Sequence, residues 1–191
     1  MSRIPQAVTR RAIYASNYAL CTLNAGVEEV AGEAARIITV NAPTYKAISD
    51  PNGVPWQAIG AIHYMECDLN FARHLANGDT LLEDTKHVPA RIMYPKEPPY
   101  SFVDAGLAAL ANYKRGWGFI VTGGVDATLQ FCEQWNGLGY WELDPPKPSP
   151  YLWSGTTAYT SGKFTSDGSY DQSAVSKQLG VVAILKALGV K

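Results

Sequence analysis

A carboxylate at the end of an apolar run is the feature that most restricts how this chain can fold. Residues 59–81 read IGAIHYMECDLNFARHLANGDTL. The first part, up to Met65, is mostly apolar or small, which is typical of a buried helix. Glu66 stands where that run ends, and the segment closes on NGD (77–79), a sequence typical of tight turns. We therefore expect a buried helix that brings Glu66 to its junction with a polar hairpin.

The composition is that of a globular protein. Hydrophobic residues make up 47% of the 191 residues and charged residues 17%, so we expect a single domain over residues 1–191, with room for two lobes. The net charge of −1 gives no electrostatic reason to expect nucleic acid or a membrane surface as partner. Three cysteines without CxxC spacing predict neither a disulfide framework nor a zinc ribbon, but reduced and mostly buried thiols.

Hydrophobic periodicity predicts a mainly α (α+β) class with one small β element. We expect the β element in residues 71–95, as a hairpin around ANGDTL. No apolar run approaches 18 residues and the N-terminus lacks the apolar core of a signal peptide, so we expect no membrane insertion. The expected helices are residues 6–22, 27–48, about 55–66, 101–114, 123–135 and 171–190, the last capped by Asp171.

Residues 136–170 form a long loop-like region rich in glycine, proline, serine and aromatic residues. Long irregular segments in compact domains are usually functional. Aromatic rings stack on the apolar faces of sugars, so several together predict a glycan-binding groove. The alternative is that they pack over the helices in place of regular structure. The aromatic residues are Tyr140, Trp141, Tyr151, Trp153, Tyr159 and Tyr170.

The apolar neighbours of Glu66 would partly desolvate its carboxylate. Desolvation raises the pKa of a carboxyl group, which can then donate a proton near neutral pH as a general acid. The hairpin that follows supplies Asp79 and Thr85, where a carboxylate or hydroxyl could hold a water molecule. Glycoside hydrolysis needs such a pair, an acid on the leaving oxygen and a base or nucleophile opposite. The alternative is a structural Glu66 that caps the helix or pairs with Arg73 or Lys86.

Four blocks of the sequence together resemble the lysozyme-like peptidoglycan hydrolases (endolysins) of phages and bacteria, a family of the lysozyme superfamily. They are AIHYMECDLNFARHLANGDTL, VPA, WNGLGY and SPYLWSGTTAYTSGKFTSDGSYD, in this order between Trp56 and Gly180. The resemblance implies a lysozyme-like helical fold with a small β-hairpin lobe. In that superfamily the catalytic glutamate ends a helix just before the β lobe, and Glu66 occupies that position.

The resemblance also implies roles for individual residues. Glu66 would be the general acid. Asp79 and Thr85 are candidates for the second catalytic group, although families of this superfamily differ there and Asp79 could simply belong to the turn. Asn136, Gly137 and Tyr140 resemble a motif that lines the cleft near the glutamate, and Asn-Gly could equally stop a helix. The predicted substrate-binding residues are His63, Asn136, Tyr140, Tyr151 and Trp153.

The sequence therefore predicts a monomeric glycosidase without metal or cofactor, which cleaves the β-1,4 bond between N-acetylmuramic acid and N-acetylglucosamine in the glycan strands of peptidoglycan. As a phage endolysin with antimicrobial action, it would be made in the host cytoplasm, without a signal peptide, and act on the wall in the periplasm. Three alternatives stay open. They are a lytic transglycosylase with the same glutamate, a non-catalytic glycan-binding or virion protein, and a zinc amidase or peptidase built on His63, Glu66, His74 and His87.

Overall fold

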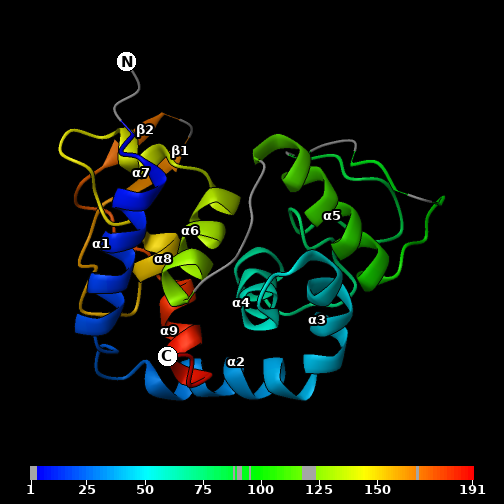
Figure 1. Cartoon of the computed structure of the whole chain (residues 1–191), viewed down its shortest axis with the longest axis horizontal. Coiled ribbons are helices and arrows are strands. Elements are labelled where there is room, and N and C mark those ends of the chain that lie inside the picture. The colour runs from blue at the N-terminus through cyan, green and yellow to red at the C-terminus, as the bar shows by residue number, and fades with distance from the viewer. Residues whose placement is uncertain (1–3, 88, 90–91, 95, 118–123, 167) are drawn as a thin grey trace. The chain divides into compact units, whose positions relative to one another are not determined.

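The computed structural model describes residues 4–87, 89, 92–94, 96–117, 124–166 and 168–191 (Figure 1). The chain divides into two compact units. We call Met1–Ala35 with Gly123–Lys191 the terminal unit, and Arg36–Thr122 the central unit. The first boundary lies inside the helix Glu28–Val40 (α2), which explains why the sequence, interpreted as one domain, did not reveal the division.

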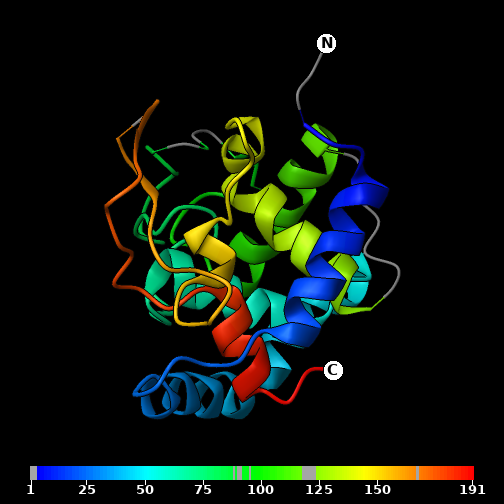
Figure 2. The same ribbon diagram turned by 90° about the vertical axis from the view of Figure 1, so that its left-hand side faces the viewer.

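Helices make up the core of the terminal unit. The N-terminal helix α1 packs along α6, as Figures 1 and 2 both show, and α8 and α9 pack on α6 and on each other. Leu129, Phe131, Leu152 and Ile184 fill the space between them and are fully or almost fully buried. The helices of this unit are α1 (Ala7–Leu20), α6 (Val125–Asn136), α7 (Gly139–Glu142), α8 (Pro150–Trp153) and α9 (Val181–Ala187).

The structure confirms the mainly α class with a small antiparallel sheet, but corrects the position of the sheet. Strands β1 (Lys163–Ser166) and β2 (Ser169–Asp171) pair within the region predicted as a loop. In the predicted hairpin, the described residues form only an isolated bridge between Arg73 and Thr80. Residues 88, 90, 91 and 95 of that segment lie outside the described residues. Hydrogen bonds between side chains and the backbone replace the regular pairing of two strands in this segment.

In the described part of the central unit, three helices follow the end of α2 and enclose a buried apolar layer. They are α3 (Ala42–Ser49), α4 (Trp56–Cys67) and α5 (Phe102–Trp117), with a 3₁₀ turn η1 (Asp50–Asn52) between the first two. Helix α3 packs on both α4 and α5. The helix predicted over 27–48 is divided into α2 and α3, because Pro43 lies in the first turn of α3 and lacks the N–H that a continuous helix would need.

Helix α4 agrees with its predicted range to within about one residue at each end. It begins directly after Pro55 and ends at Cys67. The longest helix, α5, has 16 residues. None of the helices in the described part of the chain has both the length and the apolar character that crossing a membrane requires.

The last helix is much shorter than predicted. It begins at Val181, and Asp171 belongs to β2 and caps no helix. The Asp171 carboxylate instead accepts hydrogen bonds from the backbone N–H groups of Ser173 and Ala174, which bends the chain away from the strand. The backbone N–H of Gly180 donates to the carbonyl of Ser154 and fixes the point where α9 starts.

We expect Gly180→Ala to destabilise the terminal unit. A Cβ at this position would lie 2.5 Å from the Leu152 carbonyl oxygen, and backbone atoms cannot move aside as a side chain can. The expected loss is about 1–3 kcal/mol in the free energy of unfolding, measured by urea denaturation. The matched control is Gly32→Ala in α2, which meets nothing within 4 Å and should raise stability by up to about 1 kcal/mol. Equal stability of the two variants would contradict this packing.

Candidate active site

Glu66 lies in the last turn of α4, next to its final residue, and is half-buried. Ile62, one turn earlier, is fully buried. On α5, burial and then the negative charge of Glu66 raise the pKa of Tyr113 to about 12. Tyr113 therefore belongs to the surroundings of the Glu66 carboxylate. No sequence signal predicts this neighbour, since Tyr113 continues an ordinary amphipathic helix.

The chain leaves α4 through a strained turn. Asp68 and Leu69 have φ angles of 50° and 59°, a left-handed conformation that residues other than glycine rarely adopt. Gly78, with φ of 75°, lies against the end of the helix, and a Cβ there would be 2.6 Å from the Glu66 carbonyl oxygen. The NGD turn therefore rests directly on the residue that carries the candidate acid. Strain of this kind is concentrated at functional sites.

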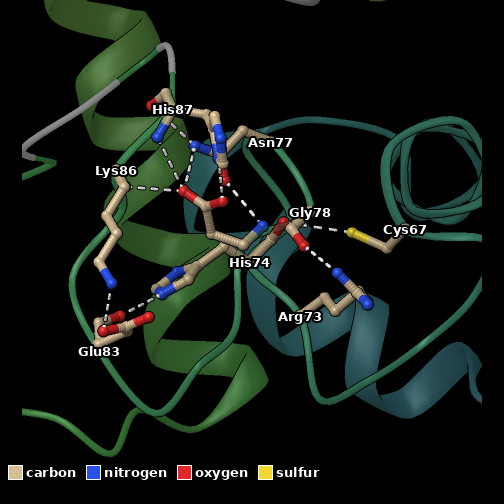
Figure 3. Close-up of polar contacts among 9 residues, drawn as sticks. Cys67, Arg73, His74, Asn77, Gly78, Glu83, Lys86 and His87 are labelled. Carbon is tan, nitrogen blue, oxygen red and sulfur yellow. Dashed lines mark hydrogen bonds and ion pairs between the residues drawn. The ribbon is translucent and has the colours of Figure 1, made fainter.

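Asp79 organises the loop after this turn, and its partners Asn77, Lys86 and His87 are labelled in Figure 3. Its Oδ2 accepts the backbone N–H groups of Lys86 (2.7 Å) and His87 (3.0 Å) and the side-chain amide of Asn77 (3.1 Å). Its Oδ1 pairs with His87 Nδ1 at 2.5 Å. Burial opposes ionisation of this carboxyl, but the hydrogen bonds from His87 and Lys86 outweigh it and lower the pKa to about 2. The carboxylate is thus engaged on both oxygens and is a weak base.

His74 is the second organiser of the loop. Its backbone N–H donates to the Asp79 carbonyl (2.6 Å), and its ring nitrogens bond the Glu83 carbonyl (2.9 Å) and the Tyr94 hydroxyl (3.0 Å). Figure 3 also shows the Arg73 guanidinium bonded to the Gly78 carbonyl, at 2.7 Å. Arg73 thus supports the turn. Lys86 forms an ion pair with Glu83 at 2.6 Å.

Thr85 is placed where it cannot hold a catalytic water. Its side chain is only 3% exposed, and its hydroxyl accepts the backbone N–H of Ile92 at 3.4 Å. A hydroxyl enclosed in its own loop does not reach a substrate. The prediction of Thr85 as a second catalytic group is therefore corrected to a structural role, because the loop folds over it.

His63 is also a core residue, which corrects its prediction as a substrate contact. It is fully buried in the central unit. The centroid of its ring lies 4.4 Å from that of Phe102 and 4.6 Å from that of Phe71. Its Nδ1 shares a hydrogen bond of 2.9 Å with the hydroxyl of Tyr45. Burial lowers the pKa of His63 to about 4, although a hydrogen bond with the Asn70 backbone acts in the opposite direction. A neutral, enclosed imidazole cannot touch a glycan.

The described residues hold no cluster of three or more histidine, cysteine, aspartate or glutamate side chains near enough to share a metal ion. The histidines proposed for the zinc alternative are used elsewhere. His63 lies in the core, His74 uses both ring nitrogens inside the loop, and His87 pairs with Asp79. This arrangement gives no support to a zinc amidase.

The burial of His63 predicts a loss of stability in mild acid. The pKa of His63 is about 4 in the folded chain and about 6.5 when exposed, so the unfolded chain takes up the proton first as the pH falls. The free energy of unfolding should fall by on the order of 3 kcal/mol between pH 6.5 and pH 4. Urea denaturation across this window should give a much flatter profile for His63→Gln. His87→Gln, at a side chain 80% exposed, should keep the slope, and a flat wild-type profile would contradict the burial.

A pocket of about 700 Å³ lies in the terminal unit. The segment 136–143 forms one wall and β1 with Gly168 forms the other. Asn136 and Tyr140, two of the predicted substrate residues, both line it. The Tyr140 hydroxyl accepts the backbone N–H of Phe164 (3.1 Å), and the two rings meet edge to face with centroids 4.9 Å apart. The structure therefore brings Asn136 and Tyr140 together and adds a hairpin wall that the sequence did not predict.

The other predicted aromatic contacts are core residues. Tyr151 and Trp153 lie in α8 and are 9% and 2% exposed. Neither lines the pocket beside Tyr140. Trp141 and Tyr159 are buried as well. These four side chains therefore pack in the core, as the alternative interpretation expects of aromatic residues in this region, because short helices need large side chains to fill the space between them.

Glu133 holds the pocket segment in place from behind. It is 1% exposed, and its Oε2 accepts the indole N–H of Trp141 (2.6 Å) and the hydroxyl of Tyr14. Burial raises the pKa of Glu133, although the hydrogen bonds from Tyr14 and Trp141 act in the opposite direction. Trp141 directly follows Tyr140, and Glu133 lies one turn before Asn136. The buried bond therefore fixes both ends of the segment that lines the pocket. A glutamate in an amphipathic helix gives no sequence signal for this role.

The predicted site residues thus fall into two groups. Glu66, Asp79, Thr85 and His63 belong to the central unit, and Asn136, Tyr140, Tyr151 and Trp153 to the terminal unit. The central unit contains Glu66 with the NGD turn against it, and the terminal unit contains the pocket lined by Asn136 and Tyr140. Comparisons of the chain with protein-family models, with curated proteins and with solved structures find no match. Its function has to be inferred from these two sites themselves.

Proposed function

We propose that this chain is a peptidoglycan-degrading glycosidase that cleaves the β-1,4 bond between N-acetylmuramic acid and N-acetylglucosamine, with Glu66 as general acid. One observation carries the proposal. Glu66 ends a buried helix, and the turn that follows the helix is folded back onto its carbonyl group. This is the position that the resemblance to lysozyme-like hydrolases assigns to the catalytic glutamate.

The chemistry needs only the protein and water. The protonated Glu66 carboxyl donates its proton to the glycosidic oxygen while the bond from that oxygen to C1 breaks, and the sugar passes through an oxocarbenium-like transition state. A water molecule then bonds to C1 and gives one proton to the Glu66 carboxylate, which restores the acid. Glu66 is half-buried, and partial desolvation of a carboxyl suits this role. Asn136 and Tyr140 would bind the glycan strand in the pocket of the terminal unit.

The bonds of Asp79 define its role in this proposal. A carboxylate that accepts three N–H groups and pairs with His87 is a poor nucleophile and a poor base. Asp79 is therefore a positioning residue, which holds the loop that rests on Glu66. The same observation favours a second candidate function, a lytic transglycosylase. In that reaction Glu66 again protonates the glycosidic oxygen as its bond to C1 breaks. The O6 hydroxyl of the muramic acid then bonds to C1, gives its proton to the Glu66 carboxylate and closes a 1,6-anhydro ring, so no water is consumed.

In a cell the enzyme would act on the wall as a monomer, as a phage lysis enzyme does.

The test of this proposed activity uses isolated peptidoglycan in water enriched in ¹⁸O, with mass spectrometry of the soluble fragments. A hydrolase should produce reducing N-acetylmuramic ends that carry one ¹⁸O. A transglycosylase should produce anhydro ends without label. Peptide fragments with intact glycan, or no soluble fragments at all, would contradict the proposal and leave an amidase or a non-catalytic glycan-binding protein.

A further inference from the structure

Among its described residues, the lining of the terminal-unit pocket has one carboxyl group. Glu142, in the last position of α7, is exposed and lines the pocket with Asn136 and Tyr140. No described lining residue carries a positive charge. Lys163 is adjacent to Phe164 in β1, but it is paired in register with Asp171 and does not line the pocket. The pocket therefore presents a negative charge, hydroxyl groups and aromatic edges to whatever enters it.

Two glycines, Gly137 and Gly139, line the pocket and leave space in it. Gly137 has φ of 105°, which only glycine adopts readily, and its missing side chain faces no atom within 4 Å. A Cβ on Gly139 would lie 3.6 Å from Cε2 of Phe164 on the opposite wall. Any side chain larger than alanine at Gly139 would thus extend into the space between the walls. A volume of about 700 Å³ accommodates a hexosamine unit with its acetamido group.

We infer that this pocket selects the uncharged N-acetylglucosamine units of a glycan strand over the anionic N-acetylmuramic acid units, and that Glu142 is the specificity-determining residue. The inference rests on the proposed function, since it concerns the same polymer. The two sugars differ by a lactyl group on O3, which ends in a carboxylate. Bringing that carboxylate beside Glu142 places like charges together with no cation to compensate, whereas the neutral sugar meets no such repulsion.

The binding test uses Glu66→Gln as background, so that no ligand is turned over. The probes are the tetramer of N-acetylglucosamine and the peptide-free tetrasaccharide in which it alternates with N-acetylmuramic acid. Titration calorimetry gives the affinities, and amide NMR shifts of Phe164 and Thr165 report the pocket. The neutral tetramer should bind at least about threefold more tightly at low salt, the size expected for one exposed pair of like charges. The difference should shrink at high salt.

Variants then separate charge from shape. Glu142→Gln should bring the two affinities together, whereas Glu29→Gln, at an exposed glutamate of the same unit outside the pocket, should leave the difference unchanged. Gly139→Leu should weaken both ligands at least about tenfold by filling the space. Equal affinity of the two probes, or shift changes that avoid Phe164 and Thr165, would overturn the inference. A failure of the proposed function is seen separately, as absence of soluble fragments from peptidoglycan with the wild type.

Discussion

Glu66→Gln should slow the release of glycan fragments from peptidoglycan by about 10²–10⁴-fold, the contribution typical of a positioned general acid. Glutamine has the shape of glutamate and can fill the same place in the last turn of α4, but it has no proton to give to the leaving oxygen. The fold should be unchanged, because Glu66 is half-buried and its carbonyl, on which Gly78 rests, is kept. The matched control is Asp68→Asn, two residues later, which should retain activity.

A change of leaving group separates acid catalysis from other losses. A dinitrophenyl glycoside of the N-acetylglucosamine dimer needs no proton on departure, so Glu66→Gln should cleave it at a rate much closer to that of wild type. The measurement is kcat/KM for this substrate and for the natural polymer with both proteins. An equal loss on both substrates would mean that Glu66 does not act as the acid.

Asp79→Ala should reduce activity by roughly 10–100-fold, the effect of loosening a catalytic group by a fraction of an ångström. It also removes the acceptor of the Lys86 and His87 N–H groups, so the free energy of unfolding should fall by about 1–3 kcal/mol. Asp79→Asn, which can still accept on one oxygen, should lie between wild type and Asp79→Ala. Activity assays and urea denaturation on the same samples check both parts.

Azide distinguishes a positioning Asp79 from a catalytic one. A glycosidase that has lost its nucleophile or base often regains activity with a small anion that takes the place of the carboxylate. Since Asp79 holds the loop and does not touch the sugar in this proposal, azide should neither restore the activity of Asp79→Ala nor appear in the products. Recovery of activity, or a glycosyl azide detected by mass spectrometry, would return Asp79 to the role of second catalytic group.

The part of the site that could be predicted from the sequence depends on local signals. The apolar run before Glu66 fixed α4, and Pro55 marked its start. The NGD sequence predicted a tight turn, and Gly78 adopts the left-handed conformation that such turns need. The block WNGLGY indicated the end of α6, and Asn136 and Tyr140 do line a pocket there. Each of these signals is contained within a few residues.

The rest depends on contacts between distant residues, which one sequence does not show. Composition could not reveal that Tyr151 and Trp153 face the core, since an aromatic residue in a loop looks the same whether it is buried or exposed. The Asp79 carboxylate accepts hydrogen bonds from the backbone N–H groups of Lys86 and His87, which lie seven and eight residues later in the sequence. The hairpin that forms one wall of the pocket consists of two short strands in a segment rich in turn residues, and such a composition predicts a loop.

In this proposal Glu66 is the general acid that makes cleavage of the glycan strand possible. This role of Glu66 is tested most directly by digesting isolated peptidoglycan with wild type and with Glu66→Gln at equal concentration. The soluble fragments are then identified by mass spectrometry. The proposal predicts glycan fragments with reducing N-acetylmuramic ends, or anhydro ends for the transglycosylase, from wild type and almost none from Glu66→Gln. Equal digestion by the two proteins, or peptides released from intact glycan strands, would contradict it.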